Sequence, residues 1–412
     1  MVEPKARANL KEGTAGSAMM IRYGLIGCGM MGQEHVRNLS LISTASVVAI
    51  FEPDASMLEA SLALLPSAVT CASLEELLAR EDFDALVITS PNFCHAGQLR
   101  AISTTMLQKQ GARPCAILCE KPLCTNLDDV AALRALPVHF VSSIWTAMEY
   151  RYMPAIAELV RAAHSEVDTG GTTMLSIREH RFPFLTKVGD WNRFSCNTGG
   201  TLVEKCCHFF DLMRLVMRAD PVRLYASGGV NHNHLEERYG PTCETPDILD
   251  NAFVVLDFPL NRRAVLDLCM FAEGSRFQEE ICVVGPRGKI ECKVPGPGRF
   301  WPAHLGPAPT AVLVYSPRQP AGPREELVPV DEALLSAGDH NGSTFYQHLR
   351  FNAAAALMVA GGGDCGGDGN GGGRMEVTFE DGLKAVIIGL AAEESARIGL
   401  AIDLTQGPFM LR

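Results

Sequence analysis

The sequence has neither a long apolar run nor a surplus of basic residues. No apolar run reaches the ~18 uninterrupted residues that a membrane-spanning helix needs. Lys and Arg number 36 against 47 Asp and Glu, which gives a formal net charge of −11. A nucleic-acid-binding face needs clustered positive charge. We therefore expect a soluble protein whose partners are small molecules, and neither nucleic acid nor membrane. The expected location is the cytoplasm, with an organellar stroma or matrix as the alternative.

The sequence also lacks any Cys-x-x-Cys motif, although it contains 14 cysteines. The spacing of Cys115, Cys119 and Cys124 fits no zinc site. Most other cysteines stand inside apolar runs, where a thiol behaves as a small hydrophobic group. We expect reduced, buried thiols and no metal site.

A glycine-rich turn follows an apolar strand at 21–26 and precedes a helix-like segment. In such a fingerprint, Gly27 makes the tight turn, Gly29 lets the backbone approach a pyrophosphate, and Gly32 lets the helix pack on the strand. The next strand, at 47–51, ends at Glu52, whose carboxylate should accept from ribose hydroxyls and repel a 2′-phosphate. The sequence therefore predicts NAD as the cofactor, with NADP disfavoured. The predicted binding residues here are Gly27, Cys28, Gly29, Met30, Met31, Gly32 and Glu52.

Short apolar runs alternate with helical stretches between residues 20 and 142, a pattern typical of a parallel, helix-covered sheet. We expect strands at 21–26, 47–51, 68–71, 85–89, 116–119 and 138–141, and helices near 30–40, 55–65 and 74–80. Ligands of such sheets bind beyond the carboxyl ends of the strands. Residues that follow the fourth and fifth strands should therefore face the nucleotide, namely Ser90, Pro91, Asn92, His95, Glu120 and Lys121.

Four motifs, G-C-G-M-M-G, F-E-P-D, T-S-P-N-F-C-H and C-E-K-P-L, occur in this order along the chain. Together they resemble the Gfo/Idh/MocA family of NAD(P)-dependent oxidoreductases. The resemblance implies that Lys121, in Glu-Lys-Pro, reaches both cofactor and substrate. If Lys121 is to act as a base, burial beside a positively charged nicotinamide must lower its pKa.

Residues 143–412 are expected to form a second, substrate-binding domain, and residues 1–19 a flexible extension. A helix near 154–163 precedes runs at 173–182, 222–230, 249–258, 264–271, 280–284 and 289–294, which predict a mainly antiparallel sheet. The segments 295–324 and 361–373 are rich in Gly or Pro and are expected to be a surface loop and a linker, followed by a helix at 380–398.

The expected fold class is therefore α/β, with an N-terminal doubly wound Rossmann sheet and a C-terminal α+β domain built on a large open sheet. The family resemblance implies that helices cover one face of this open sheet. The other face would then be free for contacts between subunits, so a homodimer or homotetramer is expected.

A second group of polar residues lies in the apolar segment 199–213. Glu204, His208 and Asp211 fall at i, i+4 and i+7 of an expected helix. A polar stripe on a buried helix needs partners, and a cleft for a polyhydroxy ligand would supply them. The segment resembles the G-G-x-x-x-D-x-x-x-H segment of the family, which implies that His208 is catalytic and that Glu204, in place of the usual aspartate, orients it. A structural histidine and a Glu204–His208 metal site are the alternatives.

Candidates for the substrate pocket flank this segment. Sugars are bound by charged and amide hydrogen bonds and by an aromatic face, so Arg151, Asp190, Trp191 and Asn192 are candidates for substrate binding. Surface charges and a tryptophan of the core are the alternatives. His340, in Gly-Asp-His-Asn-Gly, is a weaker candidate.

The sequence therefore predicts a dehydrogenase that transfers hydride between a secondary hydroxyl of a sugar, cyclitol or related polyol and the nicotinamide. Lys121 and His208 would take or relay the hydroxyl proton. An NAD-dependent glycoside hydrolase and a catalytically silent, nucleotide-sensing regulator of the same fold are the alternatives. The intact Lys121 and His208 argue against the regulator.

Overall fold

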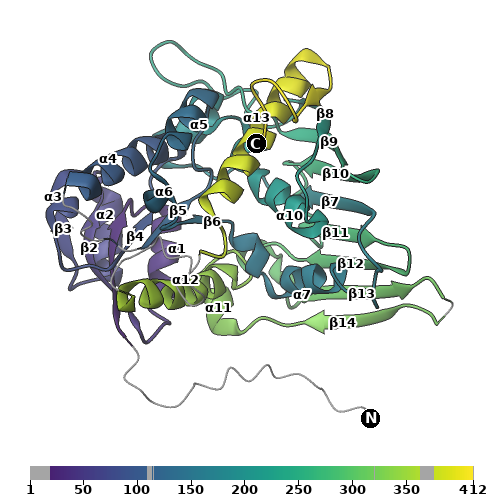
Figure 1. Cartoon of the computed structure of the whole chain (residues 1–412), viewed down its shortest axis with the longest axis horizontal. Helices are drawn as coiled ribbons and strands as arrows, with labels where there is room; N and C mark the ends of the chain where they lie inside the picture. Colours follow the sequence, from purple (N-terminus) through teal and green to yellow (C-terminus); the bar gives the residue numbers. More distant parts are fainter. Residues whose placement is uncertain (1–18, 109–113, 115, 320, 362–374, 412) are drawn as a thin grey trace.

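Two β-sheets lie on either side of a central layer of helices in the computed structural model (Figure 1). The structure describes residues 19–108, 114, 116–319, 321–361 and 375–411. The expected extension at 1–19 and linker at 361–373 lie almost entirely outside these described residues. The predicted fold class, a parallel sheet followed by a mainly antiparallel one, is confirmed.

The first sheet has six parallel strands in the order β3-β2-β1-β4-β5-β6. They are β1 (Ile21–Ile26), β2 (Ala45–Phe51), β3 (Val69–Cys71), β4 (Ala85–Ile88), β5 (Ala116–Glu120) and β6 (Ile144–Ala147). The central strands are buried on both faces, because alternate side chains enter different cores. In β4, Ala85 and Val87 enter one hydrophobic core while Leu86 and Ile88 enter the other. Such strands read as continuous apolar runs in the sequence.

Helices cover both faces of the parallel sheet (Figure 1). Leucines of α3 (Leu74–Ala79), α4 (His95–Gln108) and α5 (Leu127–Arg134) enter the core that contains Leu86. On the opposite face, α1 (Met30–Leu39) packs beside α12 (Ser343–Ala360), a helix from the C-terminal part of the chain. The Tyr23 hydroxyl donates to Asn352 Oδ1 of α12 at 2.7 Å. The C-terminal part thus completes the core of the first sheet. The helix α2 (Ala55–Leu64) follows β2.

The prediction of a strand at 138–141 is wrong. These residues form the short helix α6 (Val138–Val141), which begins after Pro137, and the sixth strand is the next apolar run, Ile144–Ala147. All four residues of β6 are buried, whereas Val138 is 81% exposed. Proline suits the start of a helix, and the sheet takes the run that it can bury on both faces.

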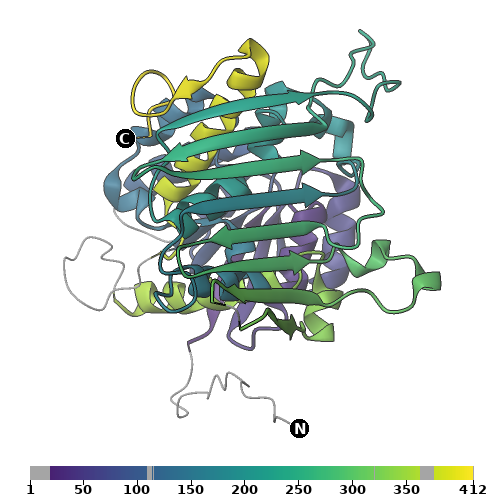
Figure 2. The same cartoon turned by 90° about the vertical axis from the view of Figure 1, so that its right-hand side faces the viewer.

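The second sheet contains nine strands in the described part of the chain, ordered β14-β13-β12-β11-β7-β10-β9-β8-β15. Among these neighbours only β7 and β10 pair in parallel. The strands are β7 (Met174–His180), β8 (Arg223–Gly229), β9 (Asn251–Phe258), β10 (Arg262–Cys269), β11 (Glu279–Val284), β12 (Gly288–Val294), β13 (Ala311–Pro317), β14 (Arg324–Val328) and β15 (Ile402–Asp403). Figure 2 shows one face of this sheet without covering helices.

The segment 295–324 is not a loop throughout, as its Pro and Gly content suggested. It includes β13, which pairs antiparallel with β12 and places Tyr315 opposite Ile290. The alternating burial of Ala311, Leu313 and Tyr315 is the period-two signal of a half-buried strand. The flanking prolines and glycines hid this short signal.

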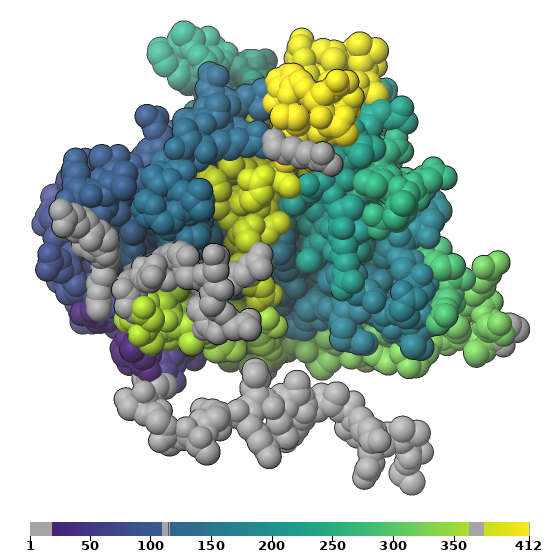
Figure 3. Space-filling model, viewed as in Figure 1, coloured from purple at the N-terminus to yellow at the C-terminus, as the bar shows by residue number. Residues whose placement is uncertain are grey.

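The helical layer between the sheets contains α7 (Pro154–Ala163), α10 (Cys207–Met217) and α13 (Phe379–Ile398). In the space-filling view, α13 lies between the N-terminal residues in blue and the C-terminal residues in teal (Figure 3). Shorter elements are η1 (Asn92–Cys94), η2 (Glu149–Tyr152), η3 (Val188–Arg193), α8 (Ser195–Thr198), α9 (Thr201–Glu204), η4 (Gly298–Phe300), η5 (Ala303–Leu305) and α11 (Glu332–Ala337). No helix of the described residues is long and apolar enough to cross a membrane.

A buried ion pair links three of these elements. Arg151 in η2 donates through Nε to Asp211 Oδ2 of α10 at 2.5 Å and through Nη2 to Asp211 Oδ1. Its Nη2 also lies 3.7 Å from Asp381 Oδ2 of α13. The Arg151 and Asp211 side chains are 10% and 1% exposed, so water screens this bidentate pair little.

We predict that Arg151→Met lowers the free energy of unfolding by about 3–5 kcal/mol, because Asp211 would remain buried without a counter-ion. Adding Asp211→Leu to that variant should recover most of the loss, since the double variant buries no unpaired charge. Urea unfolding followed by circular dichroism measures both. If the free energy of unfolding of Arg151→Met fell by less than about 1 kcal/mol, which is what an exposed ion pair contributes, this account would be contradicted.

Candidate active site

A cavity of about 760 Å³ opens beyond the carboxyl ends of β1, β2, β4 and β5. This is where an open parallel sheet binds its ligand. The residues of the sequence-predicted nucleotide set that line it are Gly27, Gly29, Met30, Met31, Glu52, Ser90, Pro91, Asn92, His95, Glu120 and Lys121. The structure thus brings most of that set to one cavity.

The glycine turn at the cavity floor tolerates no side chain at two of its three positions. Gly27 has φ +86°, and a Cβ there would lie 2.6 Å from the Ser90 backbone nitrogen. A Cβ on Gly32 would lie 2.7 Å from the Gly27 carbonyl oxygen. A Cβ on Gly29 would meet no atom within 4 Å, so this glycine borders open space. The turn is therefore shaped to let a ligand approach the backbone at Gly29.

The start of α1 is also suited to an anion. Within the described residues, no side chain caps its first N–H groups, and the N-terminus of a helix carries partial positive charge. Glu52 lies at the neighbouring strand end, where its Oε1 accepts from the Asp54 N–H at 2.8 Å and its Oε2 from the Cys28 N–H at 2.5 Å. The carboxylate is held in place and keeps lone pairs for ribose hydroxyls. These residues fit a nicotinamide dinucleotide.

Three members of the predicted set help to shape the cavity. Cys28 is buried and contributes its backbone N–H to Glu52, while Gly32 packs against the turn. The buried His95 ring lies 2.7 Å from the Pro122 carbonyl oxygen and 2.9 Å from that of Ser90, so it links the loops after β4 and β5. Cys28 and Gly32 thus shape the site without lining it, whereas His95 does both.

A smaller cavity, of about 120 Å³, adjoins the first. Five residues line both cavities, namely Met30, Met31, Lys121, Lys187 and Glu204. A molecule in the smaller cavity would therefore lie next to one end of a molecule in the larger one. The wall is strongly charged, because Arg181, Lys205, His340 and Glu279 also line it.

His208 of α10 lines the smaller cavity and is 1% exposed. Its ring stacks on that of Tyr150 with the centroids 4.2 Å apart. Burial, followed by the positive charges of Lys121 and Lys205, holds the pKa of His208 well below its usual value. The imidazole is therefore neutral at physiological pH and able to accept a proton.

The expected orientation of His208 by Glu204 is not what the structure shows. The segment is not one regular helix, because α9 ends at Glu204, α10 begins at Cys207, and the Cys206 N–H bonds to the Thr201 carbonyl five residues earlier. The carboxylate near His208 is instead that of Glu149, whose Oε1 lies 3.5 Å from Nε2. The break in the helix removes the i, i+4 relation on which the expectation depended.

Lys121 joins the two halves of the site. Its Nζ donates to the backbone carbonyl of Glu204 at 3.3 Å. Burial alone would lower the pKa of Lys121, but the negative groups around it, including Glu120 and Glu149, outweigh burial, and the net shift is upward. This is opposite to the shift that a base requires. In the protein without ligand, Lys121 is an ammonium group and can donate hydrogen bonds.

The four residues assigned to substrate binding lie in different places. Arg151 is engaged with Asp211, and the buried Asn192 donates to the Leu185 carbonyl at 3.0 Å. Asp190 adopts φ +52° in the same turn, and these three line neither cavity. Trp191 lines the larger cavity, where its ring packs edge-on against Phe93. The segment 188–193 thus bounds the predicted nucleotide site, and the weaker candidate His340 lies in the smaller cavity.

Several residues of the site were not identified from the sequence. Lys205 is buried, donates to the Tyr150 hydroxyl and lies 2.9 Å from Glu179 Oε1. Lys187 stands 5.7 Å from the centre of the Trp191 ring. These side chains come from distant segments, so no local spacing connects them. The one available signal was position, since Lys205 is next to Glu204 and Glu149 is two residues before Arg151.

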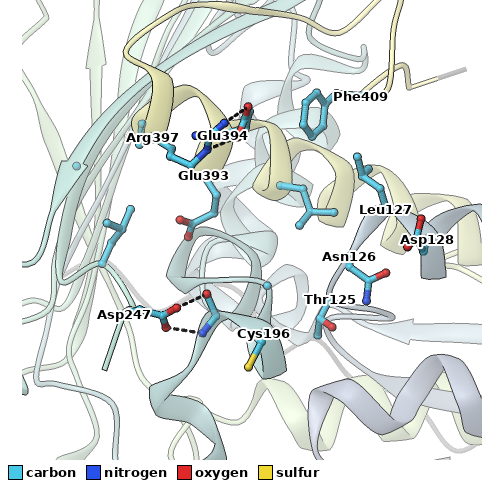
Figure 4. Close-up of a pocket in the computed structure, with 16 residues that line it drawn as sticks. Thr125, Asn126, Leu127, Asp128, Cys196, Asp247, Glu393, Glu394, Arg397 and Phe409 are labelled. Atoms are coloured by element: carbon cyan, nitrogen blue, oxygen red, sulfur yellow. Dashed lines mark hydrogen bonds and ion pairs between the residues drawn. The ribbon is translucent and has the colours of Figure 1, made fainter. Parts of the chain in front are cut away.

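A further cavity, of about 770 Å³, lies between α13 and the segment from Thr125 to Asp128 (Figure 4). Asp247 in its wall accepts from the Ser195 N–H and hydroxyl. Glu393 accepts from the Leu202 N–H at 2.8 Å, and burial raises its pKa to about 7. None of the predicted site residues lines this cavity. In the described chain, no group of three or more His, Cys, Asp or Glu is placed to hold a metal ion.

Comparisons with known proteins agree with this architecture. The model of an oxidoreductase family's NAD-binding Rossmann fold matches residues 21–137, and that of its C-terminal alpha/beta domain matches residues 170–312. The crystal structure of myo-inositol 2-dehydrogenase from Lactobacillus plantarum superposes with a TM-score of 0.67 and 19% identity, covering 93% of this chain and 99% of that one. At this identity the likeness shows the fold.

Two relatives are similar in sequence over parts of their length. The uncharacterized oxidoreductase YrbE of Bacillus subtilis is 26% identical over 246 residues, 59% of this chain and 65% of that protein. An inositol 2-dehydrogenase of Arthrobacter sp. is 36% identical over 104 residues, 25% of this chain and 28% of that protein. The chain thus matches less than two thirds of the length of either relative.

Proposed function

Because the chain belongs to the Gfo/Idh/MocA oxidoreductase family, we propose that it is an NAD-dependent dehydrogenase of a secondary hydroxyl in a sugar, cyclitol or related polyol. The observation that carries the proposal is the junction of the two cavities. Lys121 and Glu204 line both cavities, and His208 lines the smaller one beside them. A hydride acceptor and a proton acceptor would therefore face one substrate. The inositol 2-dehydrogenase relatives support the polyol class.

The residues of the site divide the work of alcohol oxidation. The turn at Gly27–Gly32 and the start of α1 would hold the pyrophosphate, and Glu52 the ribose. A bound nicotinamide supplies the hydride acceptor. His208, neutral in its buried position, takes the hydroxyl proton, and the Lys121 ammonium donates a hydrogen bond that stabilises negative charge on the same oxygen.

The direct test is an assay for stoichiometric NADH formation with a panel of polyols, sugars and cyclitols. A glycoside-cleavage assay run in parallel distinguishes the two redox uses of NAD, because net NADH accumulates only in the dehydrogenase. Dehydrogenase activity on at least one polyol is expected. Glycoside cleavage without NADH accumulation would instead identify a hydrolase.

We predict that Lys121→Ala and His208→Ala each lower turnover by roughly 10²–10⁴, the usual contribution of a positioned acid or base, while NAD binding stays within a few-fold. The double variant should lose little more than the worse single variant, because the two groups act on one oxygen. Glu204→Gln should lose less, since it keeps its backbone contact with Lys121. A His208→Ala enzyme with near-normal turnover and a lowered melting temperature would make His208 a core residue.

We also propose that NAD is preferred over NADP, on the basis of the Glu52 carboxylate at the strand end. A 2′-phosphate there would meet a fixed negative charge, and the following residues Pro53 to Ser56 bring no arginine to compensate. Glu52→Ser should narrow or reverse the preference. Calorimetric titration of wild type and variant with both nucleotides measures this, and equal or tighter NADP binding by wild type would contradict it.

We further propose a homodimer or homotetramer formed through the uncovered face of the second sheet (Figure 2). On β8, β9 and β7, Tyr225, Phe253, Val255 and Met174 are each 44–60% exposed. Tyr225 and Val255 are cross-strand neighbours, and charged pairs such as Arg223–Asp257 share the face with them. Exposed apolar side chains grouped on one face of a sheet mark association sites. Sedimentation at micromolar protein should show a species heavier than the 44.5 kDa chain, and Phe253→Glu with Val255→Lys should dissociate it. A wild-type monomer would disprove the proposal.

A further inference from the structure

The carboxyl group of Glu149 is the most unusual feature of the site that the proposed mechanism leaves unused. Glu149 begins η2, two residues after the end of β6, and is 1% exposed. Neither of its oxygens has a hydrogen-bond partner among the described residues. Burying such a group without a partner is costly. An unsatisfied carboxyl beside a candidate catalytic residue therefore requires a functional explanation.

Glu149 lies between two histidines, of which one is neutral and the other is positively charged. Its Oε1 is 3.5 Å from His208 Nε2 and 3.9 Å from His340 Nε2. His340 donates through Nδ1 to Glu34 Oε1 at 2.7 Å. Burial opposes the charge on His340, but Glu34 raises its pKa to about 9, so His340 is a cation at neutral pH. His208 is neutral, and its Nδ1 has no partner among the described residues.

We propose that Glu149 is the positioning residue of His208, a role that depends on the proposed dehydrogenase function. No hydrogen bond joins the two side chains in the structure without ligand; in the substrate complex, the carboxylate would accept one from His208 Nε2–H and leave Nδ1 as the nitrogen that takes the substrate proton. In the oxidation step, the proton leaves the substrate oxygen and binds Nδ1, and the carboxylate stabilises the resulting imidazolium. Distances between catalytic groups are often long without ligand and shorten in the complex.

Other contacts restrict His208 to this arrangement. The Tyr150 ring stacks on the imidazole at an interplanar angle of 8° and fixes its plane. Glu204, the carboxylate expected from the sequence, contributes a backbone oxygen to Lys121. The carboxylate recorded within ion-pair distance of His208 in the described structure is that of Glu149.

The charges around Glu149 allow it to change state near neutral pH. Glu120 and Lys121 face it from the end of β5, Cys207 and His208 from α10, and His340 from the segment before α12. Burial, followed by the negative charge of Glu120, raises the pKa of Glu149 to about 7, while His340 and Lys121 limit the rise. The carboxylate thus forms as pH increases through neutrality, and the oxidation rate should rise with it.

The test compares Glu149→Gln and Glu149→Asp with wild type in the full chain, with the most active polyol of the panel, from about pH 5 to pH 10. We expect wild-type kcat to rise through about pH 7. Glu149→Gln should lose this rise and roughly 10²-fold in kcat, with KM and NAD affinity within a few-fold, because the imidazolium loses its counter-ion. Glu149→Asp should retain the rise at a lower kcat.

Glu393→Gln is the matched control, since it removes another buried carboxyl with a pKa of about 7, in the separate cavity of Figure 4. It should keep the wild-type pH dependence. A Glu149→Gln enzyme with wild-type kcat and pH profile would overturn the proposal. So would parallel losses of kcat, NAD affinity and melting temperature in both Glu149 variants, which would indicate a merely structural role.

A second readout is independent of turnover. In ¹⁵N-histidine spectra of the full chain, assigned with His208→Gln, the His208 signals should show a proton on Nε2 and should shift as Glu149 ionises near pH 7. The shift should persist in Glu149→Asp. If the Glu149→Gln variant fails to fold, the Glu149→Asp variant still tests the pairing. His208 chemical shifts that do not change as Glu149 ionises would overturn the inference. Correct spectra in a protein without dehydrogenase activity would refute the proposed function and leave the pairing intact.

Discussion

The site depends on one physical constraint: charged side chains are buried, away from water, at the junction of the two sheets. Ionised groups are costly to bury unless other charges and hydrogen bonds compensate. Several of the buried charges here are compensated by a partner from a distant segment, as Arg151 is by Asp211 and Glu120 by His35 at 2.8 Å. Such pairs fix the relative positions of β5, η2, α1 and α10.

A few buried groups remain only partly compensated, and they gather around the smaller cavity. Glu149 and His208 retain unpartnered atoms among the described residues, as do Glu204, Glu179 and Glu279. Of these, Glu204, His208 and Glu279 line the smaller cavity, where a ligand with many hydroxyl groups would offer them hydrogen-bond donors. The same burial sets the protonation states, because it keeps His208 neutral while Glu34 keeps the neighbouring His340 positive. The fold therefore creates both the free acceptors and the neutral imidazole that we propose as the base.

Local signals carried the prediction of the fold. The glycine turn, the strand-end motifs and the apolar alternation each lie within a short stretch, and the strands at 21–26 and 85–89 emerged almost unchanged as β1 and β4. Two strands were predicted wrongly, because their local signals were ambiguous. Two neighbouring apolar runs were both candidates for the sixth strand, and the prolines around β13 favoured a loop.

The site was less predictable, because its geometry depends on tertiary contacts. Lys121 and His208 could be named from motifs, but the neighbour of His208 could not. Glu149 and His208 are 59 positions apart, and they meet because η2 packs against α10. A helical register from Glu204 to His208 was a reasonable assumption, and an irregular turn at Lys205 and Cys206 removed it. Sequence spacing does not report such breaks.

The packing of α12 on the first sheet has a consequence for biosynthesis. Phe351, Ala355 and Val377 belong to the same hydrophobic core as Tyr23 and Val87. During translation, the nucleotide-binding half therefore leaves the ribosome before the residues that complete its hydrophobic core. That core stays incomplete until the C-terminal third has been synthesised. At about 5–20 residues per second, this interval lasts on the order of ten seconds or more. During that time the residues of the first sheet that pack against α12 lack this cover, so the nascent chain exposes apolar surface.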